Sequence, residues 1–146
     1  MLSVFTILTA GIMGLLAILI GIAVYVVGAY GLYSMAKNRG EENSWMAWVP
    51  IANIHLIGKM VGEMTLFGQH FGNLALIAPA VSVGLIVVSF IPLIGGLLSL
   101  AGTIFVLCVI YSLIRQYRED TGTCVVFTIF NFIGFFLLRN DPVIRS

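Results

Sequence analysis

The sequence predicts an all-α integral membrane protein with four transmembrane helices and one interfacial or re-entrant amphipathic helix. Of its 146 residues, 60% are hydrophobic and only 9% are charged, whereas about 25% are charged in ordinary soluble domains. Charged residues are absent from 1–36, 64–114 and 121–138. None of these segments alternates as a barrel strand does. These segments are therefore expected to cross lipid as helices, which satisfy their own backbone hydrogen bonds.

The uncharged segments predict where the spans lie. A spanning helix needs about 20 apolar residues, so the first segment holds one span, the second holds two and the third holds one short span. Pro92, Gly95 and Gly96 predict the turn between the two middle spans. The chain is expected to be a single membrane domain over 1–146, with spans at about 9–34, 72–91, 95–115 and 121–138.

Small residues form a seam along the first expected helix. At alternating steps of four and three residues, six of seven positions are Gly or Ala, and this spacing keeps one stripe of a helix facing a partner. In lipid, small residues let two helix backbones approach closely enough to associate. The partner is either another helix of this chain or a second membrane protein, including another copy. The helix-packing positions are Ala10, Gly14, Ala17, Gly21, Gly28 and Gly31.

Residues 45–64 are expected to form the amphipathic helix. Trp45 and Trp48 are the only tryptophans, and paired tryptophans are typical anchors at the membrane–water interface. Beyond Pro50, polar and charged residues follow one helical stripe while Ile and Met lie mostly elsewhere, which suits the membrane surface or a re-entrant position. Pro50 is expected either to kink this helix or to begin a second one.

Basic residues predict the orientation. If 45–64 stays at the face where the first helix ends, five basic residues share one side of the membrane and two lie opposite. The positive-inside rule then makes the shared side cytoplasmic and places both termini outside. The shared residues are Lys37, Arg39, Lys59, Arg115 and Arg118, and those opposite are Arg139 and Arg145.

Few residues are candidates for chemistry at membrane depth. His55, Lys59 and Glu63 recur at steps of four, which places them on one helix face. They are either an ion or proton relay or the wet face of an interfacial helix. Asn131 is the one amide deep in the fourth expected span. It is expected to hydrogen-bond another helix, with a substrate contact as the alternative.

No motif predicts catalysis, a metal site or a cofactor. Cys108 and Cys124 lie in apolar segments without metal-ligand spacing, so we expect buried thiols. The net charge of +1 excludes the broad basic face of a nucleic-acid-binding protein. The expected partners are the lipid bilayer and either a second copy or another membrane protein, with no nucleic acid.

The segment after the first expected helix has a distinctive order of residues. A basic turn with small residues precedes a Trp, a Val-Pro pair, an Asn three residues later and a Gly-containing helix. In this order the chain resembles a family of small, uncharacterised bacterial polytopic membrane proteins with a Trp…(Ile/Val)-Pro-x-x-Asn segment. The resemblance implies a multi-pass protein of the bacterial cytoplasmic membrane and no assigned activity. It is carried by Ala36, Lys37, Gly40, Trp45, Val49, Pro50, Asn53, Lys59 and Gly62.

These observations favour a non-enzymatic structural or accessory subunit of a membrane assembly, either a homo-oligomer or a larger complex, that packs through the Gly/Ala seam. The alternative is a small transporter or channel using the face of His55, Lys59 and Glu63. The expected spans lack acidic residues and the sequence lacks an internal repeat, and both facts favour the first hypothesis. A membrane-embedded enzyme would need a nucleophile, base or metal cluster at membrane depth, and none is visible.

Overall fold

A computed structural model describes residues 2–66, 68–88 and 94–144. The described chain is predominantly helical, so the all-α class is confirmed. A short two-stranded hairpin, which the sequence did not predict, follows the second α-helix. The elements in order are α1 (Leu2–Asn38), η1 (Ser44–Trp48), α2 (Ala52–Val61), β1 (Met64–Leu66), β2 (Gln69–Phe71), α3 (Leu74–Val88), α4 (Ile94–Arg115), α5 (Thr121–Ile129) and α6 (Asn131–Leu138).

Two helices are long and apolar enough to cross a membrane, over Val4–Asn38 and Gly95–Arg115, and the bent pair α5–α6 makes a third if it counts as one span. At 15 residues, α3 is shorter than the roughly 20 that a span needs. Four transmembrane helices are therefore not confirmed. Gly95 and Gly96, expected in a turn, lie in the first turn of α4. Pro92 lies outside the described residues.

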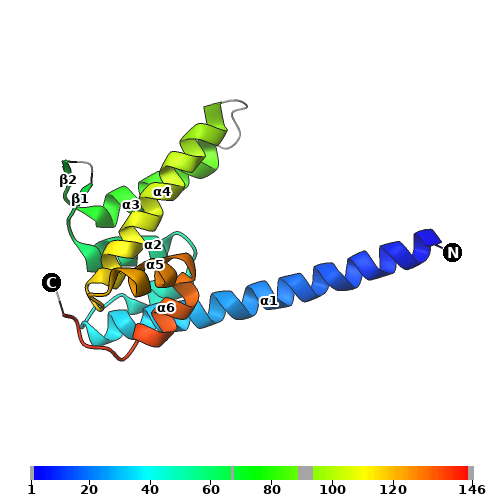
Figure 1. The fold of residues 1–146 in the computed structure, drawn as a ribbon, viewed down its shortest axis with the longest axis horizontal. Coiled ribbons are helices and arrows are strands. Elements are labelled where there is room, and N and C mark those ends of the chain that lie inside the picture. The colour runs from blue at the N-terminus through cyan, green and yellow to red at the C-terminus, as the bar shows by residue number, and fades with distance from the viewer. Residues whose placement is uncertain (1, 67, 89–93, 145–146) are drawn as a thin grey trace.

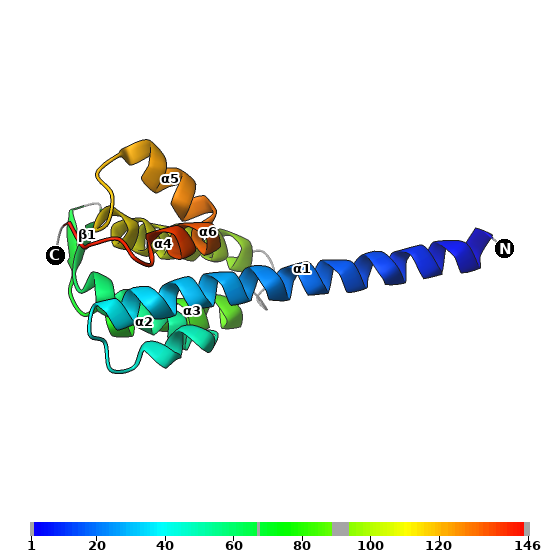
Figure 2. The same ribbon diagram turned by 90° about the horizontal axis from the view of Figure 1, so that it is seen from below.

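Two apolar helical segments, called arms below, extend from a compact group of helices, called the body, as Figures 1 and 2 show. One arm is the N-terminal half of α1, and the other is the antiparallel pair α3–α4. The body contains the C-terminal half of α1, which packs against α6 and η1, together with α2, α5 and the ends of α3 and α4. The largest fully buried side chains of the described residues lie in this body or close to it: Leu32, Met35, Leu56, Leu74, Val109, Leu113, Ile114, Cys124 and Leu138.

The single amphipathic helix expected over 45–64 is instead two short helices. η1 ends before Pro50, whose ring removes a backbone donor, and Ile51 adopts a left-handed φ of 71° before α2 begins. α2 then ends at Gly62, whose φ of 75° lies in the region that favours glycine. The hairpin follows, with Met64 paired to Phe71. α2 packs mainly on α3 and buries five residues, so it is part of the protein core, and its position at the membrane surface stays a prediction.

The short span expected over 121–138 is not one continuous helix, because α5 and α6 meet at an angle of 120°. The break falls at Phe130, with φ −103° and ψ 54°. Gly134 permits this fold-back, since a Cβ there would lie 2.9 Å from the carbonyl oxygen of Phe127. The chain therefore returns towards the end of the molecule at which α5 began.

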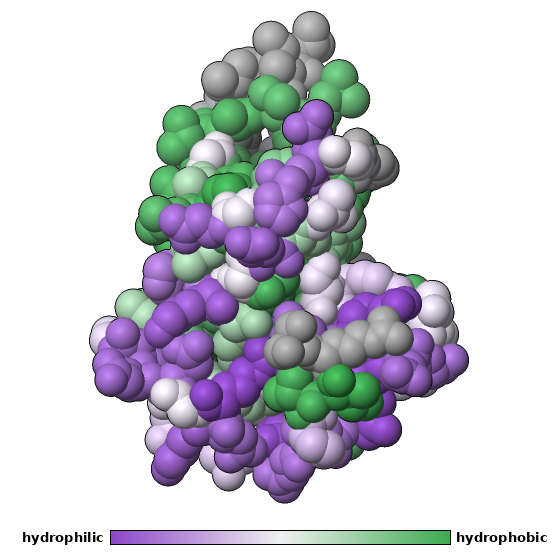
Figure 3. All heavy atoms as spheres, turned by 90° about the vertical axis from the view of Figure 1, so that its left-hand side faces the viewer, coloured by the Kyte–Doolittle hydropathy of each residue, from purple (hydrophilic) through white to green (hydrophobic). Residues whose placement is uncertain are grey.

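The bend brings the C-terminal segment to the polar end of the molecule. Asn38, at the end of α1, donates to the carbonyl oxygen of Arg139 at 2.6 Å, and Arg118 pairs with Asp141 at 2.6 Å. The expectation that Arg139 lies on the opposite side is therefore wrong. Figure 3 shows hydrophilic residues gathered over this end. Its basic side chains among the described residues are Lys37, Arg39, Lys59, Arg115, Arg118 and Arg139.

Candidate functional site

The C-terminal half of the Gly/Ala seam is an intramolecular helix contact. A Cβ on Gly28 would lie 3.0 Å from the Cβ of Phe132, and one on Gly31 would lie 2.5 Å from the backbone nitrogen of Phe136. Both neighbours belong to α6. A Cβ would be tight at Gly28 and would overlap backbone atoms at Gly31, so the small residues of the seam allow α6 to pack closely on α1. The partner is thus a helix of the same chain, although the sequence did not identify α6 as that helix.

The N-terminal half of the seam has no partner among the described residues. Every residue from 4 to 23 is exposed. Around Gly14 and Gly21, no atom considered from the described chain lies within 4 Å of an added Cβ. Ala10 and Ala17 are exposed on the same stripe. The two halves share one sequence pattern, but only the half that contains Gly28 and Gly31 packs against another helix of the described chain.

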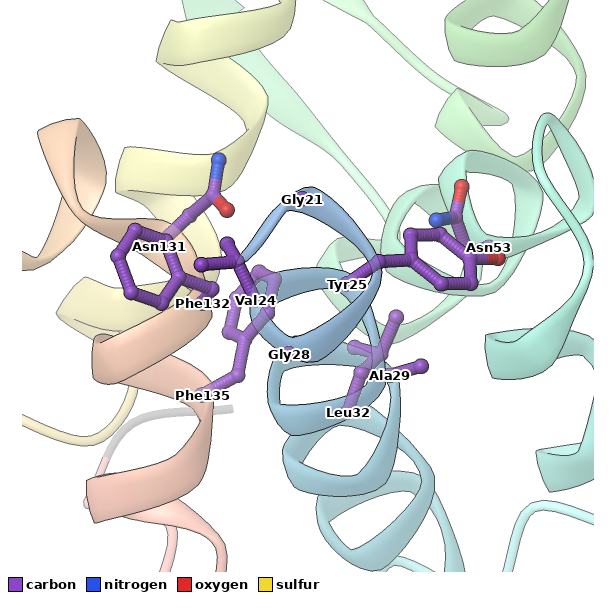
Figure 4. Close-up of a pocket in the computed structure, with 10 residues that line it drawn as sticks. All are labelled: Gly21, Val24, Tyr25, Gly28, Ala29, Leu32, Asn53, Asn131, Phe132 and Phe135. Carbon is purple, nitrogen blue, oxygen red and sulfur yellow. The ribbon is translucent and has the colours of Figure 1, made fainter. Parts of the chain in front are cut away.

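A groove lies where the free half of α1 enters the body. It has a volume of about 230 Å³ and is lined by α1, by the start of α6 and by Asn53 of α2. Figure 4 shows Asn53 and Asn131 on opposite sides of α1, with Gly21 between them. The lining residues are Gly21, Val24, Tyr25, Gly28, Ala29, Leu32, Asn53, Asn131, Phe132 and Phe135.

Two amides give this apolar groove its polar character. The Oδ1 atom of Asn53 is buried and accepts no hydrogen bond from the described residues. Asn131 is the first residue of α6, so the break at Phe130 places it at the groove. The hydrogen bond to another helix that the sequence predicts for Asn131 is not among those of the described chain. Tyr25 is already engaged, because its hydroxyl donates to the carbonyl oxygen of Trp48 at 2.8 Å. These groups can bind a partner but supply no acid, base or nucleophile.

His55, Lys59 and Glu63 do not form a continuous chain of contacts in the described structure. His55 Nδ1 lies 2.5 Å from the carbonyl oxygen of Ala75. Lys59 pairs with Glu41 at 2.5 Å, and Glu63 lies 3.2 Å from His70 across the hairpin. Each of the three side chains therefore has a different partner, and Lys59 and Glu63 lie at the polar surface.

The two tryptophans lie in η1 and expose much of their surface, 57% for Trp45 and 41% for Trp48. Val49 and Ile51 next to them are also exposed. Amphipathic aromatic side chains beside exposed aliphatic ones suit the membrane–water boundary. Their positions agree with the predicted role as interface anchors, which stays a prediction.

Arg39 is a structural centre, although its sequence context indicates only a charge in a turn. Its Nε donates to the Tyr117 hydroxyl at 2.7 Å, Nη1 to the carbonyl oxygen of Met60 at 2.7 Å and Nη2 to Gln116 Oε1 at 2.6 Å. Burial raises the pKa of the Tyr117 phenol, and the Arg39 charge partly offsets this rise. Arg39 thus ties the end of α1 to α2 and to the residues that follow α4. The sequence signal is weak, because one arginine in a charged turn does not reveal partners 21 to 78 residues away.

The described residues contain no group of three His, Cys, Asp or Glu side chains placed to hold a metal ion. Cys108 and Cys124 are free thiols, the second of them buried. Cys124 Sγ lies 3.4 Å from the carbonyl oxygen of Arg118 as a weak donor. The groove between α1 and α6 is therefore a candidate binding surface and has no visible chemistry of its own.

Comparisons with protein-family models, curated proteins and solved structures give no match for this chain. The family resemblance of the segment from Ala36 to Gly62 therefore stays a prediction. What the fold establishes is the broader class: a helical protein with two or three apolar helices long enough to span a membrane.

Proposed function

We propose that this protein is a non-enzymatic, multi-pass membrane component that associates with another membrane protein or a second copy through the free half of α1. The observation that carries this proposal is the exposed seam of Ala10, Gly14, Ala17 and Gly21. It continues the stripe with which Gly28 and Gly31 already bind α6. The free half of α1 thus exposes to the bilayer the same kind of small-residue surface on which α6 packs in the other half.

The length of the free half supports this proposal. Residues 4–23 number 20, which at 1.5 Å per residue is about 30 Å, the thickness of the hydrocarbon core. This segment would therefore cross lipid without help from the rest of the chain. The remainder of α1 would lie in the body. Since lipid itself gives little reason for a stripe of small residues, a helix partner is the better explanation of the pattern.

The experiment compares substitutions on and off the seam. Gly14→Leu and Ala17→Leu fill the stripe, whereas Ala23→Leu places the same side chain about 120° around the helix from Ala17. We expect the first two to reduce the protein to a smaller species in mild detergent extracts of its native membranes, measured by size-exclusion chromatography with light scattering. Helix content should not change, because the described chain leaves open space at Gly14.

Two outcomes contradict the proposal. One is a wild-type protein that is monomeric in these extracts and in cross-linked membranes. The other is an Ala23→Leu variant that loses assembly as strongly as Ala17→Leu. In the second case the loss would follow from added bulk anywhere on the helix and not from the seam.

The distribution of charge supports an orientation as well. All six basic residues of the described chain lie at the polar end, so we propose that this end faces the cytoplasm. The N-terminus would then lie outside and the C-terminal segment inside. In cells expressing cysteine variants, Val4→Cys should react with a membrane-impermeant maleimide and Asn140→Cys only after permeabilisation. Labelling of both variants in intact cells would instead mean that both termini lie outside the cell.

Transport through the face of His55, Lys59 and Glu63 has less support. Each of these side chains contacts a different group, Lys59 and Glu63 lie outside the apolar arms, and the described residues offer no path between them. We therefore place assembly before transport as the function.

A further inference from the structure

A second cavity lies at the polar end, and its lining is unlike that of the groove beside α1. It has a volume of about 360 Å³ and is bounded by the end of α1, by Tyr117 after α4 and by the segment after α6. Volumes of about 300–1,000 Å³ are usual for ligand pockets. Arg39 and Arg139, which are 100 positions apart in the sequence, both line it, and the fold-back of α5–α6 is what brings them together.

These two arginines are not neutralised by the ion pairs of the described residues. Lys59 pairs with Glu41, His70 with Glu63 and Arg118 with Asp141, which leaves Arg39 and Arg139 without a carboxylate partner in the part of the chain that the structure describes. Asp141 also lines the cavity, but its charge is balanced by Arg118 at 2.6 Å. Two positive charges thus remain at one cavity.

Both guanidinium groups also keep unused donors. A guanidinium has five N–H groups. Arg39 has three hydrogen-bond partners among the described residues, and Arg139 has one, the carbonyl oxygen of Phe136 at 2.6 Å. The guanidinium carbon of Arg139 also lies 3.9 Å from the centre of the Phe136 ring, and this contact helps to hold the side chain in place. Pre-oriented arginines with free donors are the usual ligands of phosphate oxygens.

From this geometry we infer that the cavity binds a phosphate group through Arg39 and Arg139, with the amides of Asn38 and Asn140 as additional polar partners. The surroundings favour a phospholipid headgroup as the source. Val143 lines the cavity, and Val143 and Ile144 beside it remain 40% and 52% exposed, which gives an acyl chain an apolar path away from the phosphate. A phosphate free in solution has the same chemistry, and the experiment distinguishes the two.

The test uses the purified full chain in detergent. Phosphatidylglycerol is added, and the bound lipid is counted by native mass spectrometry. We expect one lipid to bind in preference to further ones, and Arg139→Gln to weaken its binding about tenfold. The matched control is Arg115→Gln, which removes the same charge from the same end of the protein. Arg115 contacts Tyr111 and Thr121 and does not line the cavity, so binding should change less than twofold.

A second variant shows whether weaker lipid binding reflects the cavity itself or a loss of the fold in Arg139→Gln. Asn140→Asp adds a carboxylate at the cavity without removing any hydrogen bond of Arg39 or Arg139, and it should weaken lipid binding to a similar extent. Equal weakening by Arg139→Gln and Arg115→Gln, or no effect of Asn140→Asp, would overturn the inference and leave only diffuse surface charge.

The source of the phosphate is decided by competition. Inorganic phosphate at millimolar concentration is added to the wild-type complex with phosphatidylglycerol. Displacement of the lipid shows that the site accepts free phosphate too, and retention assigns it to the headgroup. Either result supports a phosphate site, provided that Arg139→Gln and Arg115→Gln differ. The inference does not depend on the α1 seam, because Gly14→Leu should leave phosphatidylglycerol binding unchanged.

Discussion

The two halves of α1 have the same kind of sequence and opposite surroundings. Both are apolar, both carry small residues at alternating steps of four and three, and one uninterrupted helix contains them. Residues 4–23 are all exposed, whereas Ala29, Leu32, Met35 and Ala36 are buried against the rest of the chain. A small-residue seam therefore predicts that a helix can be approached closely, but it does not say which partner approaches.

The largest effect should come from Gly31. In the Gly31→Leu variant, the new side chain would meet the backbone of Phe135 and Phe136, which cannot move without displacing α6. We expect a cost of about 3 kcal/mol or more, a large part of the stability of a typical domain. Thermal unfolding in detergent, followed by circular dichroism, checks this. Gly14→Leu is the matched control, and an equal loss of stability in both variants would remove the distinction between the halves.

Replacing one leucine by alanine in each half of α1 compares the two halves with a smaller structural change. Leu32 is 2% exposed and Leu16 is 47% exposed. Leu32→Ala should cost about 2–5 kcal/mol because it opens a cavity in the body, and Leu16→Ala should stay within about 0.5 kcal/mol. Unfolding by sodium dodecyl sulphate in mixed micelles gives both values. The comparison fails if Leu16→Ala is the more damaging change in a sample that is monomeric.

Arg39 tests how the packed half is held at its end. Arg39→Met keeps the aliphatic stem but removes hydrogen bonds to Tyr117, Gln116 and the carbonyl oxygen of Met60. Because a typical intramolecular hydrogen bond contributes a net of about 0.5–1.5 kcal/mol, we expect the loss of these three to cost about 2 kcal/mol. The same micelle titration measures it, with the exposed Lys37→Met as control. Equal values for the two variants would show that the contacts of Arg39 do not hold α1.

The smallest effect concerns the cap of α5. The Asp120 carboxylate accepts from Thr123 N at 2.8 Å and Thr123 Oγ1 at 2.6 Å, and these bonds lower its pKa. A pKa that is lower in the folded state means that the stabilisation is present above the unfolded pKa and lost as pH falls below about 4. Asp120→Asn should flatten this part of the stability profile, measured by melting temperature between pH 3 and 7. An unchanged profile would mean that the cap contributes nothing.

Some of the fold could be predicted because its cause is local. Long uncharged stretches identify α1 and α4, and the spacing of Gly28 and Gly31 identifies a helix contact. The break at Phe130 has no such signal, since no Pro or Gly lies between Gly122 and Gly134. It depends on how α6 fits against α1. The expected orientation of Arg139 was wrong for this reason, because it assumed that 121–138 continues straight.

The candidate sites show the same limit. The sequence alone shows Asn131 as an amide in an apolar segment, but Asn53 faces it across α1 only because two distant segments pack there. The cavity with Arg39 and Arg139 likewise requires residues 100 positions apart. Sequence spacing finds groups on one helix, such as His55 and Lys59, and here those two contact different partners.

The most direct test of the central claim is photo-crosslinking within native membranes. A benzophenone amino acid replaces Ala17 on the free seam or Ala23 about 120° away on the same exposed half of α1. We predict a discrete protein–protein adduct from position 17 and mainly lipid adducts from position 23. Lipid adducts alone from both positions would contradict the claim that the free half of α1 binds a helix.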